Sequence, residues 1–78
     1  MPTVARIGGH RFFFFSNEGH EPPHIHVETA DKQAKFWMEP MSLAHSIGYN
    51  ASELTRLRKL VVEHREQFKE KWHEHFSR

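Results

Sequence analysis

The sequence contains no cysteine, which excludes disulfide bonds and thiolate chemistry and is typical of a protein from a reducing compartment. It also lacks any run near the roughly 20 apolar residues that a membrane-spanning helix needs. The first residues, Met1 to Arg6, do not show the basic-then-apolar order of a signal peptide. We therefore expect a cytoplasmic protein with no membrane partner.

A strong charge of one sign is missing as well. The net charge is +1 with neutral histidines, whereas nucleic-acid-binding domains usually have an isoelectric point above about 9. The eight histidines alter this balance, because protonation of several of them near neutral pH makes the charge distinctly positive. Binding to any anionic partner should therefore depend on pH.

The sequence does contain the material for one small, aromatic-rich domain. Its 78 residues are enough for a single domain over residues 1–78, and no repeat, low-complexity tract or linker divides them. Seven phenylalanines, two tryptophans and one tyrosine make a small core feasible without disulfides.

Four β-strands are predicted from alternation and turn residues. Thr3–Ile7 and residues 10–15 flank Gly8-Gly9, a two-residue connection that favours a tight hairpin. After a turn-rich segment, His24–Thr29 and residues 34–38 form the third and fourth strands of an antiparallel sheet. Residues 41–49 fit either a fifth edge strand or one helical turn, and the sequence leaves this choice open.

A long amphipathic helix is predicted in the C-terminal part of the chain. Asn50 can cap it, and Glu53, three residues later, can return the hydrogen bond as in a capping box. Apolar residues then recur at steps of three, four and seven: Leu54, Leu57, Val61, Phe68, Trp72 and Phe76. The expected fold is α+β, an antiparallel sheet of four or five strands packed against one long C-terminal helix.

The segment from Glu21 to Glu28 is the most informative stretch. Its two prolines exclude a helix and favour an extended chain. Alternate residues of a strand share a face, so we expect His24, His26 and Glu28 to project together, about 6–7 Å apart per step. The same side should also collect Arg6, Lys35, Trp37 and one pair of phenylalanines, while the helix-facing side takes Ala5, Ile7, Ile25, Val27 and the other pair.

A metal site is one interpretation of this surface. His24, His26 and Glu28 could form a set of two histidines and one carboxylate. Three groups on one strand cannot surround an ion by themselves, and no further ligand is identifiable. The expectation is therefore no tightly bound metal and no cofactor.

Two metal-free interpretations are also open. The histidines could act as general acid and base in RNA cleavage at a 2′-hydroxyl, with Arg6, Arg11 or Lys35 stabilising the phosphate. Alternatively, they could be structural, with one imidazole bonded to the turn backbone and the other in an interface. No second motif in the sequence decides between these interpretations.

Motifs along most of the chain resemble a small bacterial family, the domain of unknown function 4160. The most specific is Glu-Pro-Pro-His-x-His-Val at residues 21–27. The others are Pro2-Thr3-Val4, Arg6-Ile7-Gly8-Gly9, Phe12-Phe13-Phe14-Phe15-Ser16-Asn17-Glu18, Ala34-Lys35-Phe36-Trp37, Glu63-His64-Arg65-Glu66, and Trp72 with Phe76. The resemblance singles out Arg6, His24, His26, Lys35 and Trp37, without implying a catalytic role for any of them.

The resemblance also implies a partner. The family is a frequent genetic neighbour of another small family, the domain of unknown function 2442. The pair is usually interpreted as a type II toxin–antitoxin module in which this family is the toxin. An antitoxin protein from a neighbouring gene is therefore the expected partner.

The leading prediction is a toxin component that acts on RNA or on translation through the outward side of the sheet. The alternatives are a non-enzymatic module that docks a protein partner through the same face, and a metal-dependent enzyme. Whether the protein is an enzyme, and whether it forms homo-oligomers, stays open. The catalytic candidates are His24, His26, Arg6 and Lys35, the binding candidates are Arg11, Glu28 and Trp37, and the metal-dependent alternative uses His24, His26 and Glu28.

Overall fold

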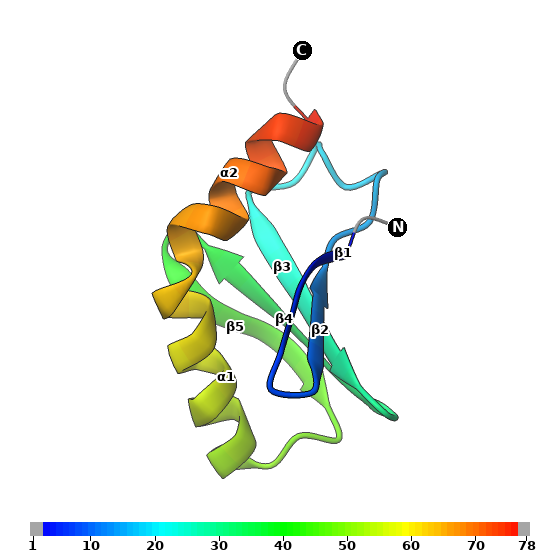
Figure 1. Cartoon of the computed structure of the whole chain (residues 1–78), viewed down its shortest axis with the longest axis vertical. Coiled ribbons are helices and arrows are strands. Elements are labelled where there is room, and N and C mark those ends of the chain that lie inside the picture. The colour runs from blue at the N-terminus through cyan, green and yellow to red at the C-terminus, as the bar shows by residue number, and fades with distance from the viewer. Residues whose placement is uncertain (1–2, 77–78) are drawn as a thin grey trace.

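The computed structural model describes residues 3–76, so Pro2, which carries part of the family resemblance, lies outside the described residues. Each strand pairs antiparallel with the next one along the chain, and the sheet order is β1-β2-β3-β4-β5. The predicted α+β class with an antiparallel sheet is confirmed. The described elements (Figure 1) are β1 (Thr3–Ile7), β2 (His10–Phe13), β3 (His24–Thr29), β4 (Lys32–Met38), β5 (Met41–Ile47), α1 (Ala51–Glu63) and α2 (Arg65–Phe76).

The hairpin of β1 and β2 has the tight connection that its glycine pair predicts. Gly8 and Gly9 both have positive φ angles, 57° and 82°, a conformation that glycine adopts without the steric cost of a Cβ atom. Ile7 pairs with His10 directly across this turn. β2 ends at Phe13, earlier than the predicted strand, because the chain leaves the sheet there and enters the β2–β3 loop.

Residues 41–47 form a fifth strand, which answers the question that the sequence left open. β5 pairs along its length with β4, and His45 lies opposite Lys35. Gly48, with a φ of 87°, follows the last residue of the strand. The sheet therefore ends in an edge strand that leads directly into the first helix.

The start of α1 follows the predicted capping box. The Asn50 side chain accepts a hydrogen bond from the Glu53 N–H at 2.8 Å, and the Glu53 carboxylate accepts one from the Asn50 N–H at 2.9 Å. Two of the N–H groups at the start of the helix are thereby satisfied. The helix begins where the sequence predicts it.

The prediction of one long helix is wrong, because the helix is interrupted at His64. His64 has φ −107° and ψ 13°, outside helical values. Its backbone N–H and its ring Nδ1 both donate to the carbonyl oxygen of Leu60, at 3.1 and 2.9 Å. A side chain that competes for a helical acceptor disturbs the regular ladder. The seven-residue step from Val61 to Phe68 fits an unbroken helix equally well, so the apolar pattern gave no sign of the break.

Both helices cover the same face of the sheet, and the core lies between the two layers (Figure 1). Each fully buried large apolar side chain contributes about 1.5–3 kcal/mol relative to exposure. Among residues 3–76, no helix is long and apolar enough to cross a membrane. The buried core residues are Phe12, Phe14, Ile25, Val27, Ala34, Phe36, Met38, Tyr49, Leu57, Val61, Phe68 and Trp72.

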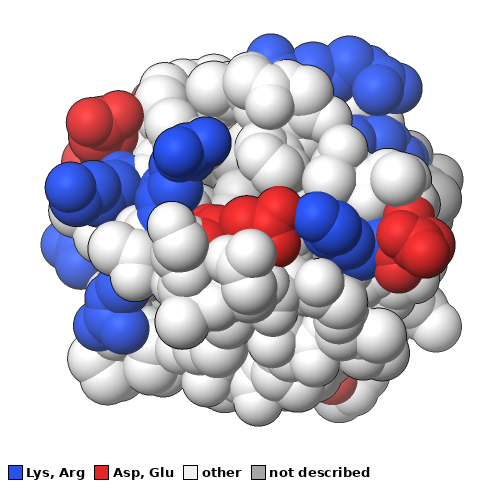
Figure 2. Space-filling view, turned by 90° about the horizontal axis from the view of Figure 1, so that it is seen from below, with Lys and Arg blue, Asp and Glu red and all other residues white. Residues whose placement is uncertain are grey.

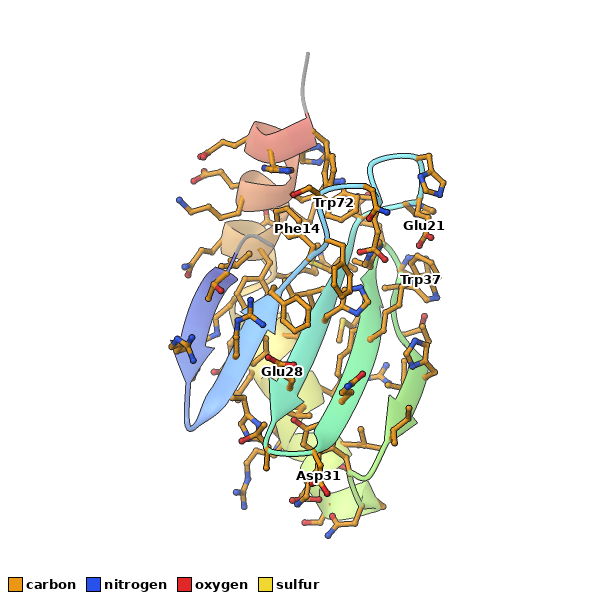
Figure 3. All side chains as sticks on the ribbon, turned by 90° about the vertical axis from the view of Figure 1, so that its right-hand side faces the viewer. Phe14, Glu21, Glu28, Asp31, Trp37 and Trp72 are labelled. Carbon is orange, nitrogen blue, oxygen red and sulfur yellow. The ribbon has the colours of Figure 1, made fainter. Side chains whose placement is uncertain are left out.

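We call the side of the sheet turned away from the helices the outer face, and Figure 3 shows it with the helices behind. Strand register aligns four of its side chains in one row. Phe13 lies opposite His26, His26 opposite Lys35, and Lys35 opposite His45. The outer face therefore has aromatic, imidazole and cationic side chains side by side.

Candidate functional site

The two histidines of β3 are placed by the prolines that precede them. The Pro23 carbonyl accepts a hydrogen bond from the Met38 N–H at 3.1 Å, so pairing with β4 already begins before β3. His24 then starts the strand opposite Trp37, and His26 follows on the same face. Strand periodicity thus brings both imidazoles to the outer face, as predicted.

The β2–β3 loop carries a carboxylate back over these imidazoles. The Glu18 N–H donates to the Phe15 carbonyl at 3.2 Å, and the Phe15 N–H donates to Glu18 Oε1 at 3.1 Å. The next residue, Gly19, lies against α2 so closely that an added Cβ atom would come 2.5 Å from the Phe76 ring. The turn and this close approach together fix the position of the Glu18 side chain.

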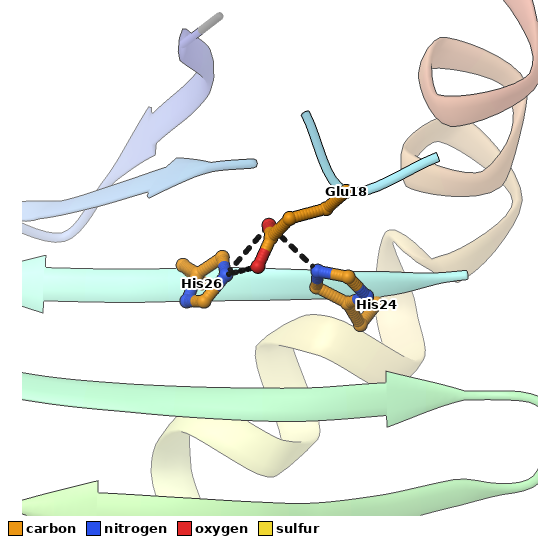
Figure 4. Close-up of side chains that lie close together, drawn as sticks. All are labelled: Glu18, His24 and His26. Atoms are coloured by element: carbon orange, nitrogen blue, oxygen red, sulfur yellow. Dashed lines mark hydrogen bonds and ion pairs between the residues drawn. The ribbon is translucent and has the colours of Figure 1, made fainter. Parts of the chain in front are cut away.

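Glu18, His24 and His26 form a compact group that we call the imidazole–carboxylate centre (Figure 4). Glu18 Oε1 lies 2.8 Å from Nε2 of His24 and 3.0 Å from Nε2 of His26. Glu18 Oε2 lies 3.2 Å from the same nitrogen of His26. One carboxylate therefore faces both imidazoles through their Nε2 atoms.

The surroundings favour the ionised form of this carboxylate. Burial alone raises the pKa of Glu18, but hydrogen bonds from His24, from the Phe15 N–H and from His26 outweigh it, so its pKa lies below the ordinary value. An ionised carboxylate accepts hydrogen bonds or binds a cation, and it donates none. The Nε2 atoms of His24 and His26 therefore face a group that accepts hydrogen bonds or binds a cation.

His24 has acceptors on both sides of its ring. Its Nδ1 lies 3.0 Å from the Pro22 carbonyl oxygen, which can only accept, so Nδ1 carries a proton. A neutral ring then has a lone pair at Nε2, facing Glu18 Oε1 at 2.8 Å. Either a second proton or a cation is needed between these two atoms. The residue is 0% exposed and contacts the rings of Trp37 and Trp72.

His26 is the more accessible imidazole of the centre. Its ring stacks on Phe13 and meets the edge of Phe15, with centroids 5.3 and 4.9 Å apart. Burial is the main reason that its pKa lies below the ordinary value, although Glu18 acts in the opposite direction. With Phe13 and Phe15, His26 lines a hollow of about 280 Å³ on the outer face. A ligand in this hollow could contact the ring of His26.

Lys35 lies beside the centre, and its charge is paired with Glu21. The Lys35 Nζ atom is 2.9 Å from Glu21 Oε1 and 4.4 Å from the centroid of the Trp37 ring. The hydrogen bond from Lys35 is the main cause that lowers the pKa of Glu21. Glu21 Oε1 also lies 3.7 Å from His24 Nδ1. Glu21 thus connects two of the predicted site residues, Lys35 and His24.

Glu28, Arg11 and Arg6 gather toward the other end of the outer face, although Glu28 also borders the hollow that His26 lines. Glu28 lies toward the opposite end of β3 from Glu21 and Trp37 (Figure 3), where it accepts a hydrogen bond from Arg11 at 2.7 Å. The Arg11 guanidinium also covers the Phe13 ring at 4.4 Å. Arg6, which is exposed, lines a second hollow of about 440 Å³ with Arg11 and Glu28. Glu28 is thus paired with Arg11 and is not in the group of possible metal ligands that His24 and His26 form with Glu18.

Glu18 is the functional candidate that sequence reasoning missed. It stands six residues before His24 in a turn-rich segment, where no periodicity tells which way a side chain points. Its only signal was membership in the motif Phe-Phe-Phe-Phe-Ser-Asn-Glu at residues 12–18. In the structure it takes the position beside the imidazoles that the sequence analysis gave to Glu28.

Comparison with known proteins gives one match. The family model described as Domain of unknown function (DUF4160) matches residues 9–73, which include β2 to β5, the whole imidazole–carboxylate centre, all of α1 and most of α2. The chain matches no curated protein and no solved structure. Because the match covers most of the chain, the protein belongs to the family described as Domain of unknown function (DUF4160).

Proposed function

We propose that the protein is the toxin component of a bacterial two-protein module and that it cleaves RNA on its outer face at the imidazole–carboxylate centre. The toxin role is supported by the resemblance, which implies an antitoxin partner from a neighbouring gene. One observation carries the site assignment: Glu18 holds His26 through both carboxylate oxygens beside an aromatic-lined hollow. Such an oriented imidazole is a common device for moving protons in catalysis.

The reaction that this arrangement suits is attack by the RNA 2′-hydroxyl on the adjacent phosphate. The 2′-oxygen forms a bond to phosphorus while the bond to the 5′-oxygen breaks, which leaves a 2′,3′-cyclic phosphate. The centre accepts the proton of the 2′-hydroxyl, and the 5′-oxygen takes a proton from water. The rings of Phe13 and Phe15 provide surfaces on which a splayed base can stack.

The two histidines have different roles in this proposal. His24 is 0% exposed and cannot touch a phosphodiester, so its role is to position Glu18. His26 lines the hollow and is the imidazole that contacts substrate. The predicted acid–base pair is thus reduced to one accessible imidazole and one buried positioning residue.

The mixture of positive and negative side chains on the surface favours RNA recognition through local contacts rather than through a broad positive electrostatic field. On the end of the molecule where α1 begins, lysine and arginine side chains lie beside aspartate and glutamate (Figure 2). On the outer face, Arg11 and Lys35 are each paired with a carboxylate. Both cations can reach a phosphate only by exchanging these partners, so base stacking is the main source of RNA affinity.

The test is expression of this chain with and without the product of the neighbouring gene. Expression alone should arrest growth, co-expression should relieve the arrest, and purified protein should cleave single-stranded RNA. His26→Ala should lower the cleavage rate by about 10²–10⁴. His20→Ala is the matched control, because it removes an exposed imidazole from the β2–β3 loop beside the centre. Arrest that His26→Ala leaves undiminished would exclude this site.

A docking role is a second candidate, favoured by a different observation. The edge strand β5 exposes Leu43 and Ile47, at 39% and 62%, next to the strand that carries Trp37. Exposed apolar side chains beside a tryptophan are a feature of protein-binding surfaces, in which tryptophan is enriched. In that case, Trp37→Ala should weaken binding of the neighbouring gene's product, whereas His26→Ala should leave both binding and growth unchanged.

A further inference from the structure

The contact between His24 and Glu18 needs a positive charge between its two atoms, either a second proton on the ring or a cation. Nδ1 of His24 donates to the Pro22 carbonyl, so a neutral ring has its Nε2 lone pair 2.8 Å from an acceptor oxygen. Two lone pairs at this distance repel each other unless something positive lies between them. The Nε2 of His26 faces the same carboxylate at 3.0 and 3.2 Å.

We propose that Glu18, His24 and His26 bind one divalent transition-metal cation of the Zn²⁺ class. Their three candidate ligand atoms all lie within 4.8 Å of one another. Ligands bonded to one ion at about 2.0–2.2 Å lie roughly 3–4 Å apart, so small side-chain movements suffice to enclose a cation. Two imidazoles and one carboxylate are a ligand set that suits zinc, iron and related ions.

The atoms around the ligands match what a metal site requires. A metal-binding histidine typically donates its other ring N–H to a carbonyl or carboxylate, which fixes the tautomer and the ring. His24 does this toward the Pro22 carbonyl at 3.0 Å, with Glu21 Oε1 at 3.7 Å from the same nitrogen. The rings of Trp37 and Trp72 hold His24 in place on other sides. This support comes from β4, α2 and the Pro-Pro segment, so the site is held by several elements.

The third ligand removes the reason to expect no metal. The sequence offered only Glu28 as the carboxylate, on the same strand as the histidines, and Glu28 is bonded to Arg11 instead. Glu18 comes from the β2–β3 loop and approaches the two imidazoles from outside the strand (Figure 4). A ligand set from two segments can enclose one side of an ion.

Three protein ligands leave coordination positions open, as in catalytic rather than structural metal sites. A cation bound here would lower the pKa of a coordinated water toward neutrality, and the hydroxide that forms when this water loses its proton could accept the proton of a 2′-hydroxyl. This catalytic meaning rests on the proposed function, since it names the proton acceptor of that reaction. The binding of the cation does not depend on RNA being the substrate.

Metal binding can be measured directly on tag-free protein that has been stripped with a chelator and dialysed. Calorimetric titration with Zn²⁺ should give one equivalent bound. Titration with Co²⁺ should give the visible absorption of a four- or five-coordinate ion. Glu18→Gln and His26→Ala should each weaken Zn²⁺ binding by more than about 100-fold, beyond the loss caused by changes outside the ligand set. His20→Ala should bind like the unchanged protein.

The outcomes separate this inference from the proposed function. Wild-type protein that binds no equivalent of Zn²⁺ or Co²⁺ contains an imidazolium–carboxylate pair instead, and the inference is wrong. Equal binding by wild type, Glu18→Gln and His26→Ala places the ions on other histidines and also overturns it. RNA cleavage that persists in chelator overturns the catalytic role of the cation but retains the proposed function. Metal binding by a protein without growth arrest or RNA cleavage retains the metal site and rejects the function.

Discussion

His24, His26 and Glu28 occupy successive outward positions on β3, yet the two ends of this series have different surroundings. At the first end, a loop carboxylate covers the imidazoles and His24 is fully buried. At the other end, Glu28 is half-buried and pairs with Arg11 of the adjacent strand. A strand therefore assigns its residues to a face, while the neighbouring strands and loops determine their chemistry.

The largest expected effect tests the packing beneath the buried end. Trp72 is 3% exposed, and its ring lies 4.7 Å from His24 and 5.3 Å from Phe14. Trp72→Ala should lower the free energy of unfolding by about 3–5 kcal/mol, because it leaves a large cavity. Urea unfolding followed by circular dichroism measures this. Val62→Ala, at a residue 53% exposed, is the control and should cost little. Equal midpoints for both variants would contradict the helix-on-sheet core.

Removal of His24 should have the next largest effect. His24→Ala opens a cavity, removes the donor to the Pro22 carbonyl and takes away one of the partners of the Glu18 carboxylate. The expected loss in unfolding free energy is about 2–4 kcal/mol. The same urea experiment in the presence of a chelator measures it without a metal contribution. A loss of unfolding free energy smaller than that of a typical surface substitution would show that the His24 end of β3 does not contribute more to stability than the Glu28 end.

Glu18→Gln isolates the charge of the carboxylate that covers the buried end. The amide keeps the size of the side chain but accepts fewer hydrogen bonds from His24, His26 and the Phe15 N–H. In chelator, a loss of about 1–3 kcal/mol in unfolding free energy is expected. Gly19→Ala offers an independent check, because its Cβ would displace the loop from Phe76 and move Glu18 with it. The circular dichroism spectrum of Gly19→Ala should remain that of a folded protein, while the contacts of Glu18 with His24 and His26 are disturbed.

The contrast along β3 also separates the features of the site that the sequence predicts from those that it does not. Alternation and the two prolines were enough to predict that His24 and His26 share a face, since both signals act within the strand itself. The partner of the histidines depends on the fold of the β2–β3 loop, whose turn residues carry no directional pattern. Glu28 has the right spacing and the right chemistry, but strand register places Arg11 beside it.

The same distinction applies to the helices and the last strand. The capping box at Asn50 and the apolar stripe are local signals, and they correctly predicted the start of α1 and its buried side. The break at His64 depends on one side-chain hydrogen bond to Leu60, which the stripe cannot show. Residues 41–47 became a strand because β4 offers an edge to pair with, a property of the assembled sheet.

Acid should also weaken the contacts of Glu53. Like Glu18, this carboxylate accepts a hydrogen bond from the backbone N–H three residues before it. Glu53 accepts a hydrogen bond from Lys32 and one from the Asn50 N–H, and these lower its pKa from the ordinary 4.5. A carboxyl group whose pKa is lowered in the folded state stabilises the fold at pH values above its unfolded-state pKa. This stability is lost as the pH falls through the folded-state pKa.

The variant Glu53→Gln should therefore flatten the dependence of the melting temperature on pH below about 4.5, because glutamine retains the capping box without the titrating charge. Thermal unfolding at a series of acidic pH values measures this slope for both proteins. Parallel curves would mean that the contacts of Glu53 with Lys32 and Asn50 contribute nothing to acid stability.

The smallest effect is expected at the end of β3 that carries Glu28, which pairs with Arg11 at 2.7 Å. The Glu28 side chain is 36% exposed, and ion pairs of this kind contribute about 0–1 kcal/mol because water and salt screen them. Glu28→Gln should therefore change the free energy of unfolding by less than Glu18→Gln does, although both remove one charge from the same face. A double-mutant cycle with Arg11→Met measures the pair itself, and its coupling should shrink further in high salt. A coupling larger than the effect of Glu18→Gln would reverse the comparison and place the tighter electrostatic contact at the Arg11 end of the strand.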